Sequence, residues 1–341
     1  MNLNENLVFP QNQMRSILVK CIDRLDPRFY PAELREGELD TLGTEIAKYC
    51  GCSKRSIVIG VGSDQILDLI FRMKLGSRGK MVTVDPTYSM YSVLAKRLGA
   101  DVDFVRVRSS TAKEPFSLAL DELIASAKRA NILVIASPNN PTGVQYPIDE
   151  IRALIQSLPE TLVVIDEAYV EYADYSTAGL LKSNKKLIIT RTFSKAFGLA
   201  SLRLGYLLSS DENFINELSE KFQYPYPVSG FSVLMATELL RRKSLVLEYA
   251  EKTKSCRKEL IEYLQKLGDK FLKVVPRSDS NFVVVRSKRS KSIAEELLSK
   301  YSVAVKYIPK MGLETEFLRI TVGSREMNQK LLYSLRRIAG A

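Results

Sequence analysis

Residues 162–169, which read LVVIDEAY, decide the fold. The four residues that begin at Leu162 are apolar without alternation, which is typical of a strand covered on both faces. Asp166 follows them directly, so a carboxylate lies at the end of a buried strand and must be paired or hydrogen-bonded. From these residues alone, Asp166 is either a structural group, such as a helix cap, or the partner of a cationic group in a ligand.

Six further apolar runs alternate with helix-like segments between about residues 40 and 250. They are residues 56–61, 80–84, 102–107, 132–136, 187–190 and 202–208. This alternation predicts an α/β fold in which helices cover a mainly parallel, seven-stranded sheet. A helical stretch at 233–267 then leads to strands at 282–285, 303–307 and 317–322 and to helices at 292–300 and after Arg325. We therefore expect an N-terminal arm (1–30) that packs on a small α+β domain (251–341), and a large domain (31–250).

Four polar segments lie where predicted strands end. They contain Gly62-Ser63-Asp64, Asn139-Asn140-Pro141-Thr142-Gly143, Asp166-Glu167-Ala168-Tyr169 and Thr192-Phe193-Ser194-Lys195. In an open α/β sheet, ligands bind beyond the carboxyl ends of the strands. We therefore expect these segments to share one site.

Each segment also has a purely structural interpretation. Ser63 or Asp64 could cap the helix predicted at 65–75, or their backbone amides could bind a phosphate at its start. Lys195 could be solvated, or it could be a Schiff-base lysine in a partly dry pocket. Arg203 lies eight residues after Lys195 and could return a guanidinium fork to the same pocket, where it would bind a phosphate.

The chain of 341 residues contains four cysteines and no histidine. Without histidine, Ser-His-Asp and Cys-His catalysis are excluded, so acid–base chemistry must come from Lys, Tyr, Asp or Glu. The same absence leaves too few ligands for a zinc site, and we predict no bound metal. The cysteines are expected to be reduced thiols.

Positive charge is concentrated in the last third of the chain. Residues 251–341 carry 20 Lys and Arg against 10 Asp and Glu, which accounts for +10 of the net charge of +11. This excess could attract an anionic small molecule, whereas no RNA-binding strand or metal finger indicates a nucleic-acid partner. No apolar run approaches the ~20 residues of a membrane span, and residues 1–10 do not read as a signal peptide, so we expect a cytoplasmic protein.

The chain resembles the fold-type I aminotransferases that depend on pyridoxal 5′-phosphate (PLP). The resemblance rests on three motifs in this order: Asn-Pro-Thr-Gly, Asp-Glu-Ala-Tyr, and Ser-Lys followed by an arginine eight residues after the lysine. The resemblance extends from Asn4 to about Arg325. It implies that Lys195 holds the cofactor as a Schiff base and moves a proton, and that Asp166 pairs with the pyridine nitrogen. It assigns the other cofactor contacts to Tyr88 (stacking), Tyr169 and Asn140 (phenolic oxygen), and Ser63, Asp64, Thr192, Ser194 and Arg203 (phosphate). Lys195, Asp166 and Tyr169 are therefore the predicted catalytic residues.

The resemblance also implies how substrate and partner subunit take part. Arg319 is similar to the small-domain arginine that binds a substrate carboxylate. Tyr30 is similar to a tyrosine that reaches the cofactor phosphate from the neighbouring subunit, which implies a homodimer with shared active sites.

Several local strings are similar to the histidinol-phosphate aminotransferase subgroup, including Leu3-Asn4-Glu5-Asn6 and residues 86–91 and 225–229. Members of that subgroup move an amino group between histidinol phosphate and glutamate, with 2-oxoglutarate as the partner keto acid. The similarity adds Tyr226, Lys306 and Asn6 as predicted substrate-binding residues.

Three departures from the subgroup keep other activities open. First, the sequence starts almost at Asn4-Glu5-Asn6, so we expect the arm that precedes this string in the subgroup, and that brings a tyrosine over the active site, to be missing. Second, Lys306 stands where the subgroup usually has an arginine. Third, Ser201 stands where the subgroup usually has a glycine. The alternatives are an aromatic amino acid aminotransferase and a threonine-phosphate decarboxylase. A non-catalytic PLP-binding regulator is disfavoured, because Lys195 and Asp166 are both retained.

Overall fold

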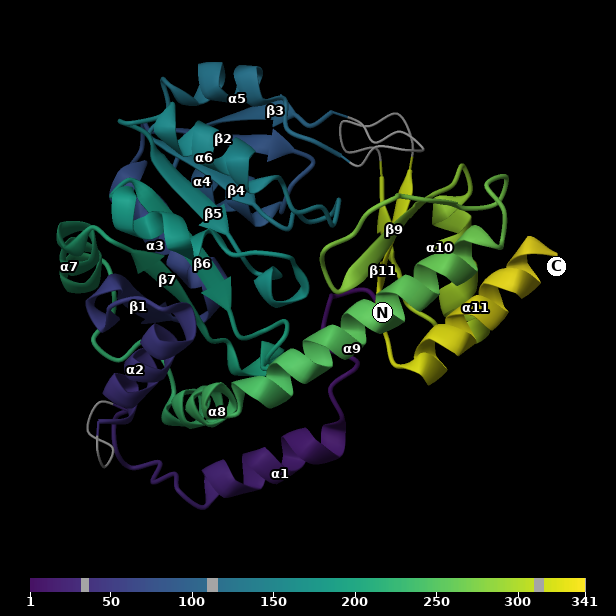
Figure 1. The fold of residues 1–341 in the computed structure, drawn as a ribbon, viewed down its shortest axis with the longest axis horizontal. Helices are drawn as coiled ribbons and strands as arrows, with labels where there is room; N and C mark the ends of the chain where they lie inside the picture. The colour runs from purple at the N-terminus through teal and green to yellow at the C-terminus, as the bar shows by residue number, and fades with distance from the viewer. Residues whose placement is uncertain (32–36, 109–115, 310–315, 341) are drawn as a thin grey trace.

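The computed structural model describes residues 1–31, 37–108, 116–309 and 316–340, and Figure 1 shows two bodies that each contain a β-sheet. The larger sheet contains β1 (Ile57–Gly60), β2 (Lys80–Asp85), β3 (Asp101–Arg106), β4 (Ile132–Ala136), β5 (Leu162–Asp166), β6 (Leu187–Thr192) and β7 (Gly205–Ser209). Its order is β1-β7-β6-β5-β4-β2-β3, and β7 alone runs antiparallel to its neighbours. The predicted α/β fold with seven mainly parallel strands is confirmed.

Helices cover both faces of this sheet, which explains its unbroken apolar runs. Along β5, Val163 and Ile165 point into one core while Leu162 and Val164 point into the other. The first core is closed by α2 (Glu38–Cys50), α5 (Leu120–Ala127), α6 (Ile148–Gln156) and α8 (Gly230–Arg241). The second core is closed by α3 (Gly62–Lys74), α4 (Met90–Arg97) and α7 (Glu212–Lys221).

The smaller body is built on an antiparallel sheet. It contains β8 (Lys273–Val274), β9 (Phe282–Arg286), β10 (Lys306–Ile308) and β11 (Phe317–Thr321), in the order β10-β11-β9-β8. A third core joins this sheet to α10 (Ser290–Tyr301), α11 (Arg325–Ala339) and the second half of α9 (Lys243–Gln265). Figure 1 shows α9 running from the larger body to the smaller one. The short 3-10 helices are η1 (Lys54–Ser56), η2 (Val170–Tyr172), η3 (Thr177–Ser183) and η4 (Ala200–Leu202).

The structure differs from the sequence-based expectation in several elements, among them the strand expected at 303–307, which is β10 (Lys306–Ile308). The helical stretch at 233–267 is two helices, because Arg242 leaves the helical conformation between α8 and α9. α8 is buried on most sides, whereas α9 buries a single stripe, so the break lets the two helices take different environments. The helix expected at 65–75 begins at Gly62, and the two-residue strand β8 was not predicted.

The N-terminal segment divides its contacts between the two bodies. Met1 accepts a hydrogen bond from the backbone of Thr321 in β11, and Leu7 forms an isolated bridge with Gly323. The helix α1 (Gln11–Ile22) instead packs against α8 and buries Ile17 in the first core. Within the described ranges, no helix is long and apolar enough to cross a membrane.

A buried ion pair lies where β5 and β6 end. Arg191 donates to Glu167 Oε2 from Nε (3.0 Å) and Nη2 (2.8 Å), and the two side chains are only 6% and 1% exposed. Glu167 also accepts hydrogen bonds from the hydroxyls of Ser176 (2.9 Å) and Thr177 (2.7 Å). Every oxygen of this carboxylate therefore has a partner, which is what a buried charge requires.

We expect Glu167→Ala to lower the free energy of unfolding by about 3–5 kcal/mol, because it leaves the buried Arg191 guanidinium without the carboxylate that it pairs with. Urea unfolding followed by circular dichroism measures the change. The control is Glu217→Ala, which removes an exposed pair with Lys221 (3.4 Å) and should cost less than about 1 kcal/mol. Equal losses in the two variants would contradict the structural role of the buried pair.

Candidate active site

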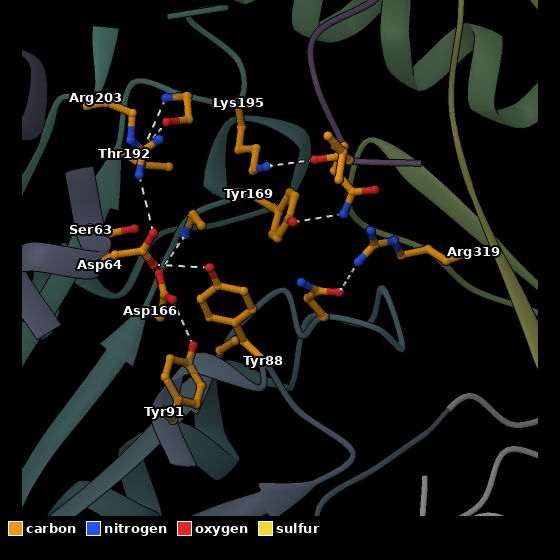
Figure 2. A pocket seen from close by; sticks show the side chains of 16 residues that line it. Ser63, Asp64, Tyr88, Tyr91, Asp166, Tyr169, Thr192, Lys195, Arg203 and Arg319 are labelled. Atoms are coloured by element: carbon orange, nitrogen blue, oxygen red, sulfur yellow. Dashed lines mark hydrogen bonds and ion pairs between the residues drawn. The ribbon is translucent and has the colours of Figure 1, made fainter. Parts of the chain in front are cut away.

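A cavity of about 250 Å³ opens beyond the carboxyl ends of β4, β5 and β6, and side chains of both bodies reach it (Figure 2). It is lined by Leu3, Asn4, Ser63, Asp64, Tyr88, Tyr91, Ala136, Asn140, Asp166, Ala168, Tyr169, Thr192, Ser194, Lys195, Arg203 and Arg319. The four polar segments singled out in the sequence thus contribute to one site, as expected from the position of the strand ends.

One end of the cavity is rich in hydrogen-bond donors. Ser63 and Asp64 lie in the first turn of α3, whose N-cap position is taken by Val61 without a side-chain cap. The backbone amides of a first helical turn have no partner within the helix and attract anions. The helix-cap interpretation of Ser63 and Asp64 is therefore wrong, and their amides remain available to a ligand.

The same end holds two hydroxyls and a guanidinium. Thr192 Oγ1 donates to Ser194 Oγ (3.0 Å), and Arg203 Nη2 lies 3.3 Å from Asp64 Oδ2. Gly62 makes this approach possible: its φ is +74°, and a Cβ there would lie 3.0 Å from Arg203 Nη2. Hydroxyls, a guanidinium and free helical amides form a donor set that suits a phosphate group.

The middle of the cavity is formed by Asp166, the last residue of β5. This carboxyl is 4% exposed, and burial raises its pKa to about 6, although a hydrogen bond from Tyr91 opposes the rise. Tyr91 donates its hydroxyl to Asp166 Oδ2 (2.7 Å), and the Ala168 amide donates to Oδ1 (3.2 Å). Asp166 has neutral hydrogen-bond partners but no cationic one in these contacts, so it can accept a cationic ligand group.

Lys195 and Tyr169 are neighbours in the cavity, with the amine over the tyrosine ring. Lys195 Nζ lies 5.7 Å from the centre of the Tyr169 ring and donates to the backbone carbonyl of Leu3 (3.2 Å). Tyr88 lies on the opposite side, where its hydroxyl donates to Asp64 Oδ1 (3.0 Å) and its ring meets Tyr91 edge-on at 5.5 Å. Figure 2 shows these side chains around one central space.

The smaller body contributes Arg319 from β11. Its Nη1 donates to Asn140 Oδ1 (2.6 Å) and its Nη2 to the carbonyl of Asn2 (2.7 Å). Burial lowers the pKa of this guanidinium from its usual value, but arginine still stays charged. The side chain offers a charged fork to an anion at the boundary between the two bodies.

Four residues predicted from the sequence do not line the cavity. Tyr30 and Tyr226 stack on each other at 4.2 Å and are 57% and 46% exposed. Lys306 is exposed on β10, directly opposite Arg319 in the antiparallel ladder. Asn6 donates to the carbonyl of Ala196 (2.8 Å), next to Lys195, and its Oδ1 accepts from the Phe9 amide (3.0 Å).

Two polar lining residues were not predicted to act in the site. Tyr91 belongs to the segment 86–91 in which only Tyr88 was given a role, and Asn4 lies two residues before Asn6. Each hydrogen-bonds a predicted catalytic residue, Tyr91 to Asp166 and Asn4 to Tyr169. Neither residue has a local signal: Tyr88 lies before the start of α4, so helical spacing does not place Tyr91 beside it, and nothing local indicates Asn4.

We expect Asp166→Asn to stabilise the ligand-free protein above pH 6. The pKa of Asp166 is raised in the folded state, so the wild-type protein loses stability as pH rises from about 4 to 6, by up to about 3 kcal/mol for two pKa units. The variant should lack this loss, which urea unfolding at pH 4.5 and pH 8 would measure. Asp101→Asn on the exposed edge of β3 is the control, and an identical pH dependence in wild type and Asp166→Asn would contradict the assignment.

Comparisons with known proteins agree with this geometry. Residues 32–335 match the family model for aminotransferase class I and II. The chain is 32% identical over 337 residues to histidinol-phosphate aminotransferase 2 of Archaeoglobus fulgidus, covering 98% of this chain and 91% of that protein. Its fold is similar to that of the Sinorhizobium meliloti histidinol-phosphate aminotransferase in complex with PLP (TM-score 0.86, 24% identity, 99% of this chain and 90% of that chain). It is also similar to the L-threonine-O-3-phosphate decarboxylase from Porphyromonas gingivalis (TM-score 0.81, 21% identity, 97% and 96%). The family predicted from the motifs is confirmed, and the chain belongs to the class I and II aminotransferases.

Proposed function

We propose that this protein is a PLP-dependent aminotransferase that converts histidinol phosphate and 2-oxoglutarate into imidazole-acetol phosphate and glutamate. The observation that carries the proposal is the convergence of Lys195, Asp166 and Arg203 on one cavity. A reactive amine, a carboxylate without a cationic partner and a phosphate-binding guanidinium are the three groups that hold PLP at its two ends and its ring nitrogen. The relationship to a histidinol-phosphate aminotransferase over nearly the whole chain supports the choice of substrate.

The residues present fit PLP. The phosphate would be held by the amides of Ser63 and Asp64, the hydroxyls of Thr192 and Ser194, and Arg203, whose guanidinium packs against Gly62 where a side chain would press on it. Asp166 would pair with the pyridine nitrogen, Tyr88 would stack on the ring, and Tyr169 and Asn140 would hydrogen-bond the phenolic oxygen. When bound, PLP supplies an electron sink for a carbanion at the substrate's Cα.

The protein's own groups would then position the substrate and move its proton. Lys195 Nζ is the base that would take the proton from Cα, since no histidine is available and the other amines do not reach the cavity in the described part of the chain. Asp166, ionised above about pH 6, would keep the ring nitrogen charged. Arg319 and Asn140 together would orient the anionic group of the substrate.

Lys306 gives the small sheet a second cation beside Arg319. The two residues are direct partners in the β10–β11 ladder, and side chains at such positions project from the same face with Cβ atoms about 4.5–5.5 Å apart. This register supports the predicted role of Lys306. Two neighbouring cations suit a site that must accept a phosphate ester in one half-reaction and a dicarboxylate in the other.

A homodimer with shared active sites would explain why Tyr30 and Tyr226 are exposed outside the cavity of their own chain. Both rings are exposed, stack on each other and lie outside the cavity of their own chain. We propose that this tyrosine pair completes the cavity of the partner subunit, with Tyr30 at the cofactor phosphate and Tyr226 near the substrate.

A single-turnover absorbance experiment tests the substrate. PLP-loaded protein would be mixed separately with L-histidinol phosphate, L-glutamate, L-phenylalanine and L-threonine phosphate. Rapid loss of the absorbance band of the lysine-bound cofactor with the first two compounds only is the expected result. A fast reaction with phenylalanine and none with histidinol phosphate would favour an aromatic aminotransferase. Release of carbon dioxide from threonine phosphate would favour the decarboxylase.

We expect Lys195→Ala to abolish transamination and to retain much of the PLP affinity, because the phosphate contacts and Asp166 remain. Turnover and equilibrium dialysis of PLP measure the two effects separately. Lys182→Ala, which changes an exposed lysine of η3, should be active. Retained turnover in Lys195→Ala would remove this lysine from the mechanism.

We expect Lys306→Ala to raise the KM for histidinol phosphate roughly 5- to 150-fold, since a charge-assisted hydrogen bond contributes about 1–3 kcal/mol. Steady-state kinetics measure the change. Lys306→Arg should retain or improve binding, because a guanidinium can form a fork on a phosphate. The control is Lys300→Ala on the exposed face of α10, and an unchanged KM in Lys306→Ala would show that other groups bind the phosphate.

A further inference from the structure

Asn4 connects the smaller sheet to the catalytic residues of the larger one. It lines the cavity, is 1% exposed and adopts a left-handed backbone conformation with φ +57°. Its backbone carbonyl accepts from Asn281 Nδ2 (3.0 Å), which fixes the chain at this point. Asparagine tolerates this conformation better than most residues with a side chain. The position therefore combines an unusual backbone with a buried polar side chain in the active site.

The surrounding hydrogen bonds determine which way the Asn4 amide faces. The Thr321 hydroxyl oxygen accepts from the Asn4 backbone N–H (3.1 Å), so its single proton is free to be donated. That proton goes to Asn4 Oδ1 (3.1 Å). Because Oδ1 is turned towards Thr321, the amide nitrogen must face the other way, towards Tyr169. Thr321 is fully buried, so water does not compete for these contacts.

The orientation of the amide in turn sets the hydroxyl of Tyr169. Asn4 Nδ2 donates to Tyr169 Oη at 2.9 Å, and an amide nitrogen cannot accept the phenolic proton in return. Tyr169 is also a cavity residue, so its own O–H is left to point at an acceptor inside the cavity. An asparagine at position 4 therefore makes Tyr169 a hydrogen-bond donor towards the ligand.

We propose that Asn4 is a positioning residue that commits the Tyr169 hydroxyl to donate to the phenolic oxygen of PLP. The proposal rests on the proposed function, because it concerns the same cofactor site. The negative charge of the phenolic oxygen favours a proton on the neighbouring lysine-bound nitrogen, and a hydrogen-bond donor at that oxygen weakens this effect. The pH midpoint of the cofactor's absorbance change is therefore lower with this donor than without it. Thr321 and Asn281 hold Asn4 in place, so the direction of the Tyr169 hydroxyl depends on how the smaller body binds the N-terminal segment.

The test uses Asn4→Asp, which preserves the size of the side chain and its tolerance of the left-handed backbone. The new carboxylate can still accept from Thr321, but it presents an acceptor to Tyr169 where the amide presented a donor. The Tyr169 hydroxyl should then turn to the carboxylate and away from PLP. We expect the pH midpoint of the absorbance change of PLP-loaded Asn4→Asp to rise by about one unit or more, as it should in Tyr169→Phe.

A double-mutant cycle separates positioning from charge and from structure. In a Tyr169→Phe background, Asn4→Asp should cause a smaller shift, because the hydroxyl through which Asn4 acts has been removed and only the direct effect of the new charge remains. Asn4→Gly tolerates the left-handed backbone without a side chain and should give a smaller shift than Asn4→Asp. If Asn4→Asp does not fold, Thr321→Val, which frees the amide to rotate, should raise the midpoint in the wild-type background alone.

An unshifted midpoint in Asn4→Asp, or an equal shift in the Tyr169→Phe background, would overturn the proposal. Either result would leave the proposed function intact, because PLP would still be bound. Failure of the proposed function has a different signature, since wild-type protein mixed with PLP would then show no lysine-dependent absorbance band at all.

Discussion

The active site depends on a constraint of the larger sheet: its parallel strands end at the same edge. Asp166 is the last residue of β5 and is paired in the ladder with Ala136 of β4 and Thr190 of β6. Because helices cover both faces of this sheet, its edge is the place where polar side chains can gather without disturbing a core. The segments after β4, β5 and β6 therefore deliver Asn140, Tyr169 and Lys195 to one cavity, although they lie far apart in the sequence.

The larger sheet does not complete the site alone. Arg319 comes from β11 in the smaller body, and its guanidinium is shared between Asn140 and the backbone of Asn2. Lys195 likewise donates to the backbone of Leu3. The first residues of the chain thus lie between the two bodies and contact a cation of each. Arg319 Nε has no hydrogen-bond partner among the residues that the structure describes, so the guanidinium keeps a donor free beside the Asn2 carbonyl.

The sequence predicts those parts of the site that follow local patterns. Apolar runs, several of them unbroken, located all seven strands, and the polar segments behind them contained Asp166, Lys195 and Arg203. The contacts of Asn4 and Tyr91 could not be predicted, because they join residues 165 and 75 positions apart and leave no periodic signal. Lys306 and Arg319 were each predicted to bind substrate, but only the β10–β11 register shows that they are direct partners. The break at Arg242 also escaped prediction, because no proline or glycine marks it.

Asp166 and Glu167 show how one strand end serves both stability and chemistry. The two carboxylates are adjacent and both buried, and consecutive side chains of an extended segment point to opposite faces. Glu167 meets the Arg191 guanidinium and two hydroxyls, so its charge is compensated within the fold. Asp166 meets the Tyr91 hydroxyl and one backbone amide, and burial therefore raises its pKa to about 6. These contacts bring no positive charge to Asp166, so the fold leaves this carboxylate open to a ligand group that carries one.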